Sequence, residues 1–206
     1  MKNLIKLDLS KNFITELPDT IRNLSSLQEL NLDKNKLRKL PDAIGRLKNL
    51  RKFEVFGNSL DNVPKIIGKL INLQELKLWQ NNINYLPDTI GNLKDLHLLY
   101  LSYNNLIDLP ITIGNLKKLE LLFLNDNKLA TIPDSIGQLI NLKRVYLWKN
   151  HLSSIPDSIG NLKKLEWLDL HSNYLSLIPE SIGNLTNLKT LIIKKNQNKQ
   201  HIYLKN

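Results

Sequence analysis

The sequence predicts an α/β solenoid, in which short parallel strands line the concave side and short α or 3₁₀ segments form the convex side. Three observations support this fold class. A pattern of 23 residues repeats along the whole chain, asparagine occupies its twelfth place, and proline occupies its eighteenth. Self-similarity at a fixed period indicates stacked units that contact only their neighbours and share one core. A solenoid has no pocket by default, so its function depends on the places that vary.

The strand of each unit is expected near places six to ten. Leucine predominates at places one, four, seven and nine, and leucine or isoleucine at places fourteen and seventeen. Because alternate side chains of a strand face opposite ways, places seven and nine point into the core. Places six, eight and ten then face the concave surface, with places eleven and thirteen at its rim. The units begin at Met1, Leu24, Leu47, Leu70, Leu93, Leu116, Leu139, Leu162 and Leu185.

A turn is expected where each strand ends, at the twelfth place. An asparagine amide both donates and accepts hydrogen bonds, so stacked copies can satisfy the buried backbone groups of each unit as it leaves the strand. All nine units carry this residue, at Asn12, Asn35, Asn58, Asn81, Asn104, Asn127, Asn150, Asn173 and Asn196.

A short α or 3₁₀ segment is expected after each proline. Proline is tolerated at the first position of a helix, where its missing N–H is not needed, and the acid that usually follows suits a helix N-terminus. Glycine at the twenty-second place allows tight packing or a turn before the next strand. The prolines are Pro18, Pro41, Pro64, Pro87, Pro110, Pro133, Pro156 and Pro179, and the glycines are Gly45, Gly68, Gly91, Gly114, Gly137, Gly160 and Gly183.

Two complete units read "LSSLQELNLDKNKLRKLPDAIGR" at residues 24–46 and "LKKLEWLDLHSNYLSLIPESIGN" at residues 162–184. This pattern resembles the leucine-rich repeat family, in its 23-residue form with an "LPxxIGxLxxL" second half, and the resemblance covers the whole chain. It implies a right-handed superhelix in the shape of a horseshoe. It is similar both to bacterial repeat proteins that are secreted or surface-displayed and to intracellular scaffold repeats of eukaryotes. The Lys, Asn and Ile bias and the lack of cysteine favour a bacterial source.

One leucine-rich-repeat domain over residues 1–206 accounts for the chain, with residues 197–206 as a C-terminal cap in which Ile202, Tyr203 and Leu204 cover the last core layer. The first unit starts in register at Met1, and a charged pair at places six and eight interrupts any signal peptide there. We expect that an upstream segment was removed by processing or cloning; the alternative is a natural start with an exposed end. The protein is secreted or on the cell surface if that segment held a signal peptide, and cytoplasmic otherwise. No apolar run approaches the roughly 20 residues of a membrane helix.

The net charge of +10 raises the question of nucleic-acid binding. Many lysines, however, fall at the second and third places, on one lateral edge just after the convex segment. Lysine there complements the C-terminal end of the segment and solvates the flank. A solvated edge is therefore favoured over a nucleic-acid interface, which calls for a basic groove with aromatic residues or a known motif. These lysines are Lys48, Lys94, Lys117, Lys118, Lys163 and Lys164.

The concave places differ sharply between the two halves of the chain. The first two units present only charged and polar groups there, whereas units five to eight present a contiguous apolar and aromatic face. Large exposed apolar patches mark interaction sites, and aromatic residues beside an arginine are typical of binding hot spots. The alternative is that the rings only stack across strands and stabilise the sheet. The predicted partner-binding residues are Phe56, Trp79, Leu98, Tyr100, Leu121, Phe123, Arg144, Tyr146, Trp148 and Trp167.

Asp169 and His171 are two residues apart on one strand face and can reach a common point, where Zn²⁺ with a ligand from another chain would link protomers. Solvated side chains are the alternative. No nucleophile elbow, phosphate loop or HExxH motif occurs, so no catalytic residues and no other cofactor are predicted.

The leading hypothesis is a non-enzymatic module that binds a protein partner, such as a host protein, through units four to eight. Two alternatives stay open. The chain forms homo-oligomers, through that face or the uncapped first unit and with or without metal, or it is the targeting domain of a larger enzyme.

Overall fold

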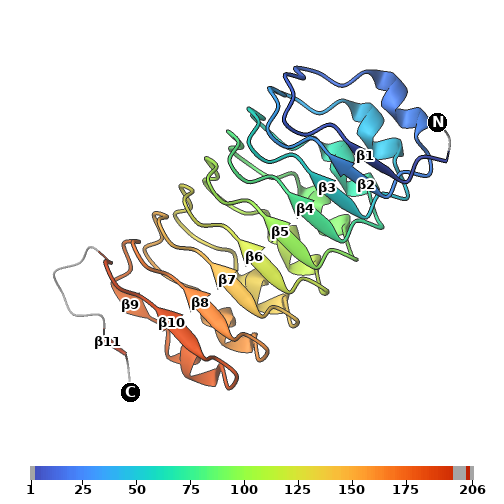
Figure 1. Ribbon diagram of the computed structural model, residues 1–206. Helices are drawn as coiled ribbons and strands as arrows, with labels where there is room; N and C mark the ends of the chain where they lie inside the picture. The colour runs from blue at the N-terminus through green and yellow to red at the C-terminus, as the bar shows by residue number, and fades with distance from the viewer. Residues whose placement is uncertain (1–2, 197–202, 205–206) are drawn as a thin grey trace.

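The computed structural model describes residues 3–196 and 203–204. Nine parallel strands form one open sheet in which each strand pairs with that of the next unit, so the sequence order is also the spatial order (Figure 1). The predicted α/β solenoid is confirmed. The strands are β1 Lys6–Asp8, β2 Glu29–Asn31, β3 Lys52–Glu54, β4 Glu75–Lys77, β5 Leu98–Tyr100, β6 Leu121–Phe123, β7 Arg144–Tyr146, β8 Trp167–Asp169 and β10 Thr190–Ile192.

Eight short helices lie opposite the sheet, and all of those in the described residues are 3₁₀ helices rather than α-helices. Each proline precedes its helix by one residue, in an extended conformation such as φ −70° and ψ 150° at Pro133. The proline carbonyl accepts the first hydrogen bond of the helix, from the N–H of the third helical residue, as Pro133 O does from Ile136 at 2.9 Å. Proline therefore occupies the N-cap and not the first helical position. The helices are η1 Asp19–Asn23, η2 Asp42–Arg46, η3 Lys65–Lys69, η4 Asp88–Asn92, η5 Ile111–Asn115, η6 Asp134–Gln138, η7 Asp157–Asn161 and η8 Glu180–Asn184.

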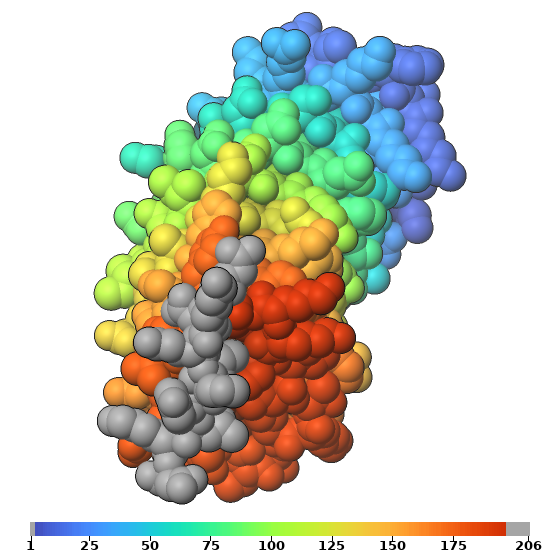
Figure 2. Space-filling model, turned by 90° about the vertical axis from the view of Figure 1, so that its left-hand side faces the viewer, coloured from blue at the N-terminus to red at the C-terminus, as the bar shows by residue number. Residues whose placement is uncertain are grey.

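One apolar core runs through the stack of units. Figure 2 shows how the units follow one another along the molecule in chain order. Strand places seven and nine supply buried leucines, as at Leu99 and Leu101, and places fourteen and seventeen close the core from the far side. The same places are only partly buried in the first unit, at Leu7 and Leu9, because they have a neighbour on one side alone. The inward and outward alternation read from the sequence is therefore confirmed.

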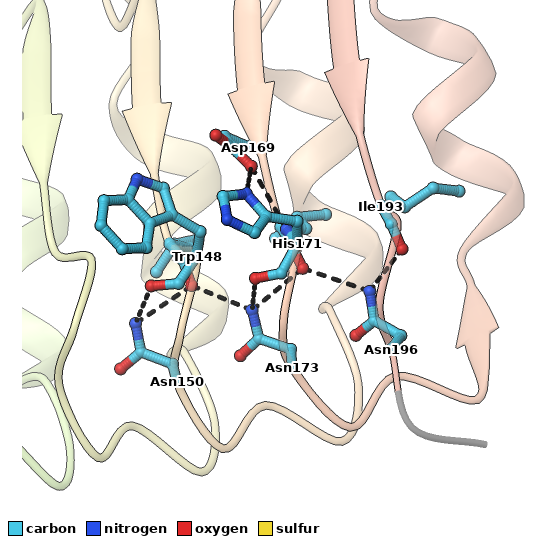
Figure 3. Close-up of polar contacts among 9 residues, drawn as sticks. Trp148, Asn150, Asp169, His171, Asn173, Ile193 and Asn196 are labelled. Carbon is cyan, nitrogen blue, oxygen red and sulfur yellow. Dashed lines mark hydrogen bonds and ion pairs between the residues drawn. The ribbon is translucent and has the colours of Figure 1, made fainter.

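The twelfth-place asparagines form the predicted ladder. In unit six, Asn127 Nδ2 donates to Leu101 O of the preceding unit at 2.9 Å and to Leu124 O of its own unit at 3.0 Å, while Asn127 Oδ1 accepts the N–H of Leu106 at 3.0 Å. The same arrangement recurs along the chain, and Figure 3 shows the amide nitrogens of Asn150, Asn173 and Asn196 bonded to strand-end carbonyls. Each asparagine from Asn35 to Asn196 thus joins two units.

The eleventh place, just before each asparagine, adopts a left-handed backbone conformation with φ between +51° and +64°. Glycine occupies this place only in unit three, at Gly57. A side chain in this region costs roughly 1 kcal/mol, so the asparagine ladder must hold the turn against its local preference. The sequence predicted a turn at the strand end but not its left-handed backbone conformation, because the residue type at the eleventh place varies freely.

The ends of the chain are described in part. Met1, with which the first unit was predicted to begin, lies outside the described residues, as do residues 197–202 and 205–206 of the predicted cap. The backbone of β11, Tyr203–Leu204, pairs in parallel with β9, Leu177–Ile178, in a separate two-stranded sheet. Within the described residues, no helix has the length and apolar character needed to cross a membrane.

Candidate binding surface on the concave sheet

Ion pairs occupy the sixth place of the first four units and the eighth place of units three and four. Lys6 Nζ lies 3.1 Å from Glu29 of the next strand, and Lys52 pairs with Glu75 at the same distance, both at the sixth place. Lys77 pairs with Glu54 at the eighth place. Partners directly opposite each other on adjacent strands neutralise one another, so this half of the face presents few unpaired charges.

Lysines on the lateral edge contact the C-terminal ends of helices, but of the helix that follows each lysine and not, as the sequence predicted, of the one that precedes it. Lys48 Nζ donates to Lys69 O at 3.1 Å, and Lys163 Nζ donates to Asn184 O at 2.8 Å. Each acceptor is the last residue of the 3₁₀ helix that ends the lysine's own unit, where carbonyls lack partners within the helix. These edge lysines therefore have a structural role.

Aromatic rings stack along the eighth place of units five to seven. The Tyr100 and Phe123 rings are 4.0 Å apart between centroids, and the Phe123 and Tyr146 rings are 4.6 Å apart with planes within 6° of parallel. Each ring is half-buried by its neighbours. The rings of this row therefore stack on one another, and their outer edges face the concave side.

The tenth place produces a hollow beside this row. Reading along the units, it holds Trp79, Ser102, Asn125 and Trp148, so two large rings flank two small polar side chains. The hollow has a volume of about 560 Å³ and is open to solvent. The nine residues that line it are Lys77, Trp79, Tyr100, Ser102, Tyr103, Phe123, Asn125, Tyr146 and Trp148.

Each tryptophan wall of the hollow is supported from outside. The Trp79 ring stacks on Phe56 with centroids 3.9 Å apart and planes within 1° of parallel. The Trp148 ring stacks on His171 at 5.3 Å and 10°. Since the neighbour covers one face of each indole, the other face is directed along the sheet toward the hollow. Tyr103 adds an edge contact to Trp148, with centroids 6.1 Å apart.

The floor of the hollow is polar and buried. Ser102 Oγ donates to Asn125 Oδ1 at 2.6 Å, and both residues are only 5% exposed. Asn125 Nδ2 makes no hydrogen bond to the residues that the structure describes. This amide is therefore a donor held in place by Ser102 and available to a ligand.

Asp169 and His171 contact each other, as Figure 3 shows. His171 Nδ1 lies 2.7 Å from Asp169 Oδ1, and the same oxygen accepts the backbone N–H of His171 at 3.2 Å. Asp169 is buried and orients the imidazole behind the Trp148 ring. No cluster of three or more potential metal ligands occurs among the described residues, and a shared zinc ion would have to replace the bond between these two side chains. The zinc site remains a prediction.

The hollow brings together half of the residues that the sequence predicted for partner binding: Trp79, Tyr100, Phe123, Tyr146 and Trp148. Phe56 lies behind Trp79. The sixth-place residues Leu98, Leu121, Arg144 and Trp167 form a separate row of neighbours on adjacent strands. The indole N–H of Trp167 is buried without a partner in the described part of the chain, so this ring is packed against the sheet.

Sequence reasoning missed Lys77, Ser102, Tyr103 and Asn125. The signal for two of them was the contrast in side-chain size along the tenth place, where Ser102 and Asn125 leave space between two tryptophans. Tyr103 could not be assigned to the hollow from its rim position, because the left-handed backbone at φ 56° directs its ring toward Trp148 of a later unit.

Asp33, at the tenth place of unit two, has an unusual pKa. Burial raises the pKa of its carboxyl from the usual 3.8 to about 6, against the opposing effect of a hydrogen bond from the backbone N–H of Phe56, and the Glu54 charge raises it further. That hydrogen bond measures 2.7 Å and ties Asp33 to the strand end that carries the Phe56 ring. The carboxylate form is therefore disfavoured in the folded chain.

We expect Asp33→Asn to increase stability at neutral pH. The folded chain binds the Asp33 proton more tightly than the unfolded chain does, so protonation stabilises the fold. This stabilisation is fully present below the unfolded pKa of 3.8 and is lost as the pH rises through the folded pKa of about 6. The shift is discounted for solvent screening because the group is half-buried, so the gain is about 1 kcal/mol at pH 7 and disappears near pH 4. Urea unfolding of both proteins across this range measures the difference.

Asp8→Asn is the control for this titration. A hydrogen bond from Ser10 lowers the pKa of Asp8, so its carboxylate stabilises the folded chain above the unfolded pKa and this effect is lost as the pH falls. The two variants must therefore differ from the wild type in opposite directions at pH 7. A gain from Asp33→Asn that does not change between pH 4 and pH 7 would show that titration is not its cause.

A family model described as a leucine-rich repeat region matches the sequence over residues 2–84, 61–149 and 133–204. Among solved structures, a leucine-rich repeat protein of Leptospira interrogans is 45% identical with a TM-score of 0.88, and the match covers 93% of this chain and 49% of that one. No curated protein matches the sequence.

Two plant receptors have the same fold. The ectodomain of the Arabidopsis thaliana membrane receptor kinase GASSHO1/SCHENGEN3, in complex with CASPARIAN STRIP INTEGRITY FACTOR 2, is 36% identical with a TM-score of 0.84, over 92% of this chain and 24% of the receptor. The plant peptide hormone receptor RGFR1, in complex with RGF2, is 32% identical with a TM-score of 0.79, over 91% and 35%. The chain thus spans about half of the Leptospira protein and less of each receptor.

Proposed function

Because this chain belongs to the leucine-rich repeat family, whose fold is commonly a protein–protein interaction module, we propose that it is a non-enzymatic protein that binds a polypeptide partner on its concave face. The hollow between Trp79 and Trp148 is the observation that carries this proposal. The ion-paired first half of the face offers a partner far less apolar surface. The likeness to receptors crystallised with protein or peptide partners supports the same assignment.

The chemistry of the hollow favours a specific partner. Aromatic rings contribute large apolar contact areas at low entropic cost, and they dominate binding energy when a partner excludes water from them. Here the stacking of Trp79 on Phe56 and of Trp148 on His171 holds both walls before the partner arrives. A preorganised site loses little side-chain freedom on binding, which raises affinity.

The source of the protein and the kind of partner are a finer part of the proposal. The likeness to a protein of Leptospira supports a bacterial source. We extend the proposal to a protein of such a bacterium's host as the partner. The chain matches about half of the Leptospira protein. We therefore include partners that bind a longer protein of which this chain is a part, and the capture experiment below covers that case.

Trp148→Ala combined with Phe123→Ala is expected to abolish capture of the partner. The double variant removes one wall of the hollow and the central ring of the row beside it, while both sites lie on the surface and not in the leucine core. Loss of two hot-spot rings weakens binding by about a hundredfold or more. Affinity capture from host and native lysates, followed by mass spectrometry, compares the double variant with the wild type.

Lys6→Ala with Glu29→Ala provides the matched control, because it changes two concave residues of the ion-paired half. This variant should retain the partner at the wild-type level. If both double variants retain it equally, the hollow is not the binding surface. Retention of only a second copy of the chain would identify self-association, and sedimentation with and without a chelator then separates direct contact from a metal link through Asp169 and His171.

A further inference from the structure

Among the side chains that line the hollow, more groups can only donate than can only accept a hydrogen bond. Asn125 Nδ2 has no partner among the described residues, the indole N–H groups of Trp79 and Trp148 can only donate, and the tyrosine hydroxyls can donate or accept. The side-chain amide oxygen of Asn125 is already bonded to Ser102. None of the nine lining residues is a carboxylate, and the one charged group among them is Lys77. A ligand that fits must therefore supply acceptors and few donors.

This donor-rich lining discriminates between the common forms of peptide ligand. An added β-strand needs a free sheet edge, but β4, β5, β6 and β7 are paired on both sides. An α-helix satisfies its backbone carbonyls internally, so its backbone offers no acceptor to Asn125 Nδ2. An ordinary extended peptide presents an N–H at each residue, and these would meet few acceptors in the hollow.

A polyproline II segment meets both requirements. Its carbonyls are free because the helix has no internal hydrogen bonds, and each proline lacks an N–H. Proline-rich segments bind in grooves lined by aromatic rings, where the pyrrolidine rings pack on the aromatic faces. In the hollow, the inner faces of Trp79 and Trp148 and the ring edges of Tyr100, Phe123 and Tyr146 provide such a lining.

The dimensions agree with this ligand. Trp79 and Trp148 are three units apart, which corresponds to roughly 14 Å at about 4.8 Å per strand. A polyproline II helix rises about 3.1 Å per residue with three residues per turn, so roughly four or five residues span the two walls. Prolines one helical turn apart lie on the same side of the ligand and can both pack on the ring edges of Tyr100, Phe123 and Tyr146, while a carbonyl of the segment accepts from Asn125 Nδ2.

We propose that the hollow between Trp79 and Trp148 binds a proline-rich segment of the partner in the polyproline II conformation. This inference rests on the proposed function, because it names the kind of segment that the concave face holds. The partner is thereby distinguished by its chemistry: a run of about five residues with prolines three apart, bound mainly through aromatic packing and its own carbonyls.

Selection from a random 12-residue peptide library displayed on phage tests the inference. The library is first depleted on immobilised Trp148→Ala protein and then selected on the wild type. We expect the retained peptides to be enriched in proline at a spacing of three residues. Enrichment of peptides without proline, or no enrichment over the depleted library, would overturn the proposal.

A retained peptide is then synthesised and titrated against three proteins by fluorescence polarisation. Asn125→Asp keeps the oxygen that accepts from Ser102 but replaces the Nδ2 donor with a second acceptor, so affinity should fall by at least about tenfold. Asn115→Asp, on the exposed end of η5, is the matched control and should bind normally. Trp148→Ala removes one wall without placing a charge in the floor and should also bind at least about tenfold more weakly.

The outcomes distinguish a failure of the polyproline assignment from a failure of the proposed function. If the peptide binds Asn125→Asp and Trp148→Ala as tightly as the wild type, the polyproline assignment is wrong. If lysate capture still depends on Trp148 and Phe123 while the library yields no proline-rich peptide, only this further inference fails. If lysate capture is insensitive to Trp148 and Phe123, the proposed function itself fails.

Discussion

Replacing Asn127 with alanine is expected to lower the free energy of unfolding by about 3 kcal/mol. The variant leaves the buried N–H of Leu106 without an acceptor and removes one donor each from Leu101 O and Leu124 O. A buried donor without a partner costs about 1–3 kcal/mol, and the loss of two further bonds adds to this. Urea unfolding followed by circular dichroism measures the change. Because each unit is stabilised by its neighbours, the unfolding transition should also broaden.

Asn12→Ala is the control, since it is the same substitution at the same place of the first unit. Asn12 is exposed, and its Nδ2 donates only to Leu9 O and Ser10 O. No N–H of a preceding unit depends on its Oδ1 within the described residues. We expect this variant to cost less than about 1 kcal/mol. If Asn12→Ala and Asn127→Ala lower the free energy of unfolding equally, the hydrogen bonds between units do not explain the stabilising effect of the asparagines.

Gly137→Ala is expected to cost about 3 kcal/mol through overpacking between units six and seven. A Cβ at this position would lie 2.3 Å from Ser158 O and 2.7 Å from Ser158 Cβ, so the backbones of η6 and η7 must move apart. Rigid backbone cannot yield as a long side chain does, and the shift opens the core beneath it. Thermal and urea unfolding measure the loss.

Gly183→Ala tests the same substitution where space is available. A Cβ at Gly183, in η8, meets no atom of the described residues within 4 Å. This variant should be neutral or more stable by about 0.5 kcal/mol, because alanine restricts the unfolded chain. If Gly137→Ala is as well tolerated as Gly183→Ala, close packing does not explain the glycine at the twenty-second place.

Most of the fold could be predicted because each structural requirement recurs in every unit. The asparagine of the twelfth place makes the same bonds at Asn81 as at Asn150, and a single interpretation of its amide therefore applies along the chain. The leucines of places seven and nine are buried for the same reason in each central unit. The helix type was left open between α and 3₁₀, since five residues after a proline suit either form.

The candidate site is formed by residues that differ from one unit to the next. The repeat pattern describes only what the units share, so it does not predict these residues. The aromatic residues could be predicted to face one surface, but whether they would stack or stand apart depends on contacts between neighbouring rings. The hollow exists because Ser102 and Asn125 are small where Trp79 and Trp148 are large, and because Tyr103 turns toward Trp148. Such contacts between units follow from side-chain volume and backbone direction together. They became evident only in the three-dimensional arrangement.

Thiol labelling at single cysteines tests most directly whether a partner occupies the hollow. The chain has no cysteine of its own, so Gln80→Cys and Lys11→Cys each introduce one reactive group. Both positions are exposed at the eleventh place with left-handed backbones, at φ 55° and 56°. Gln80 adjoins Trp79, whereas Lys11 lies in the first unit, whose Lys6 pairs with Glu29. With saturating partner captured from lysate, labelling at position 80 should fall to the background rate and labelling at position 11 should not change. Unchanged labelling at position 80, or equal protection at both positions, would contradict binding at the aromatic hollow.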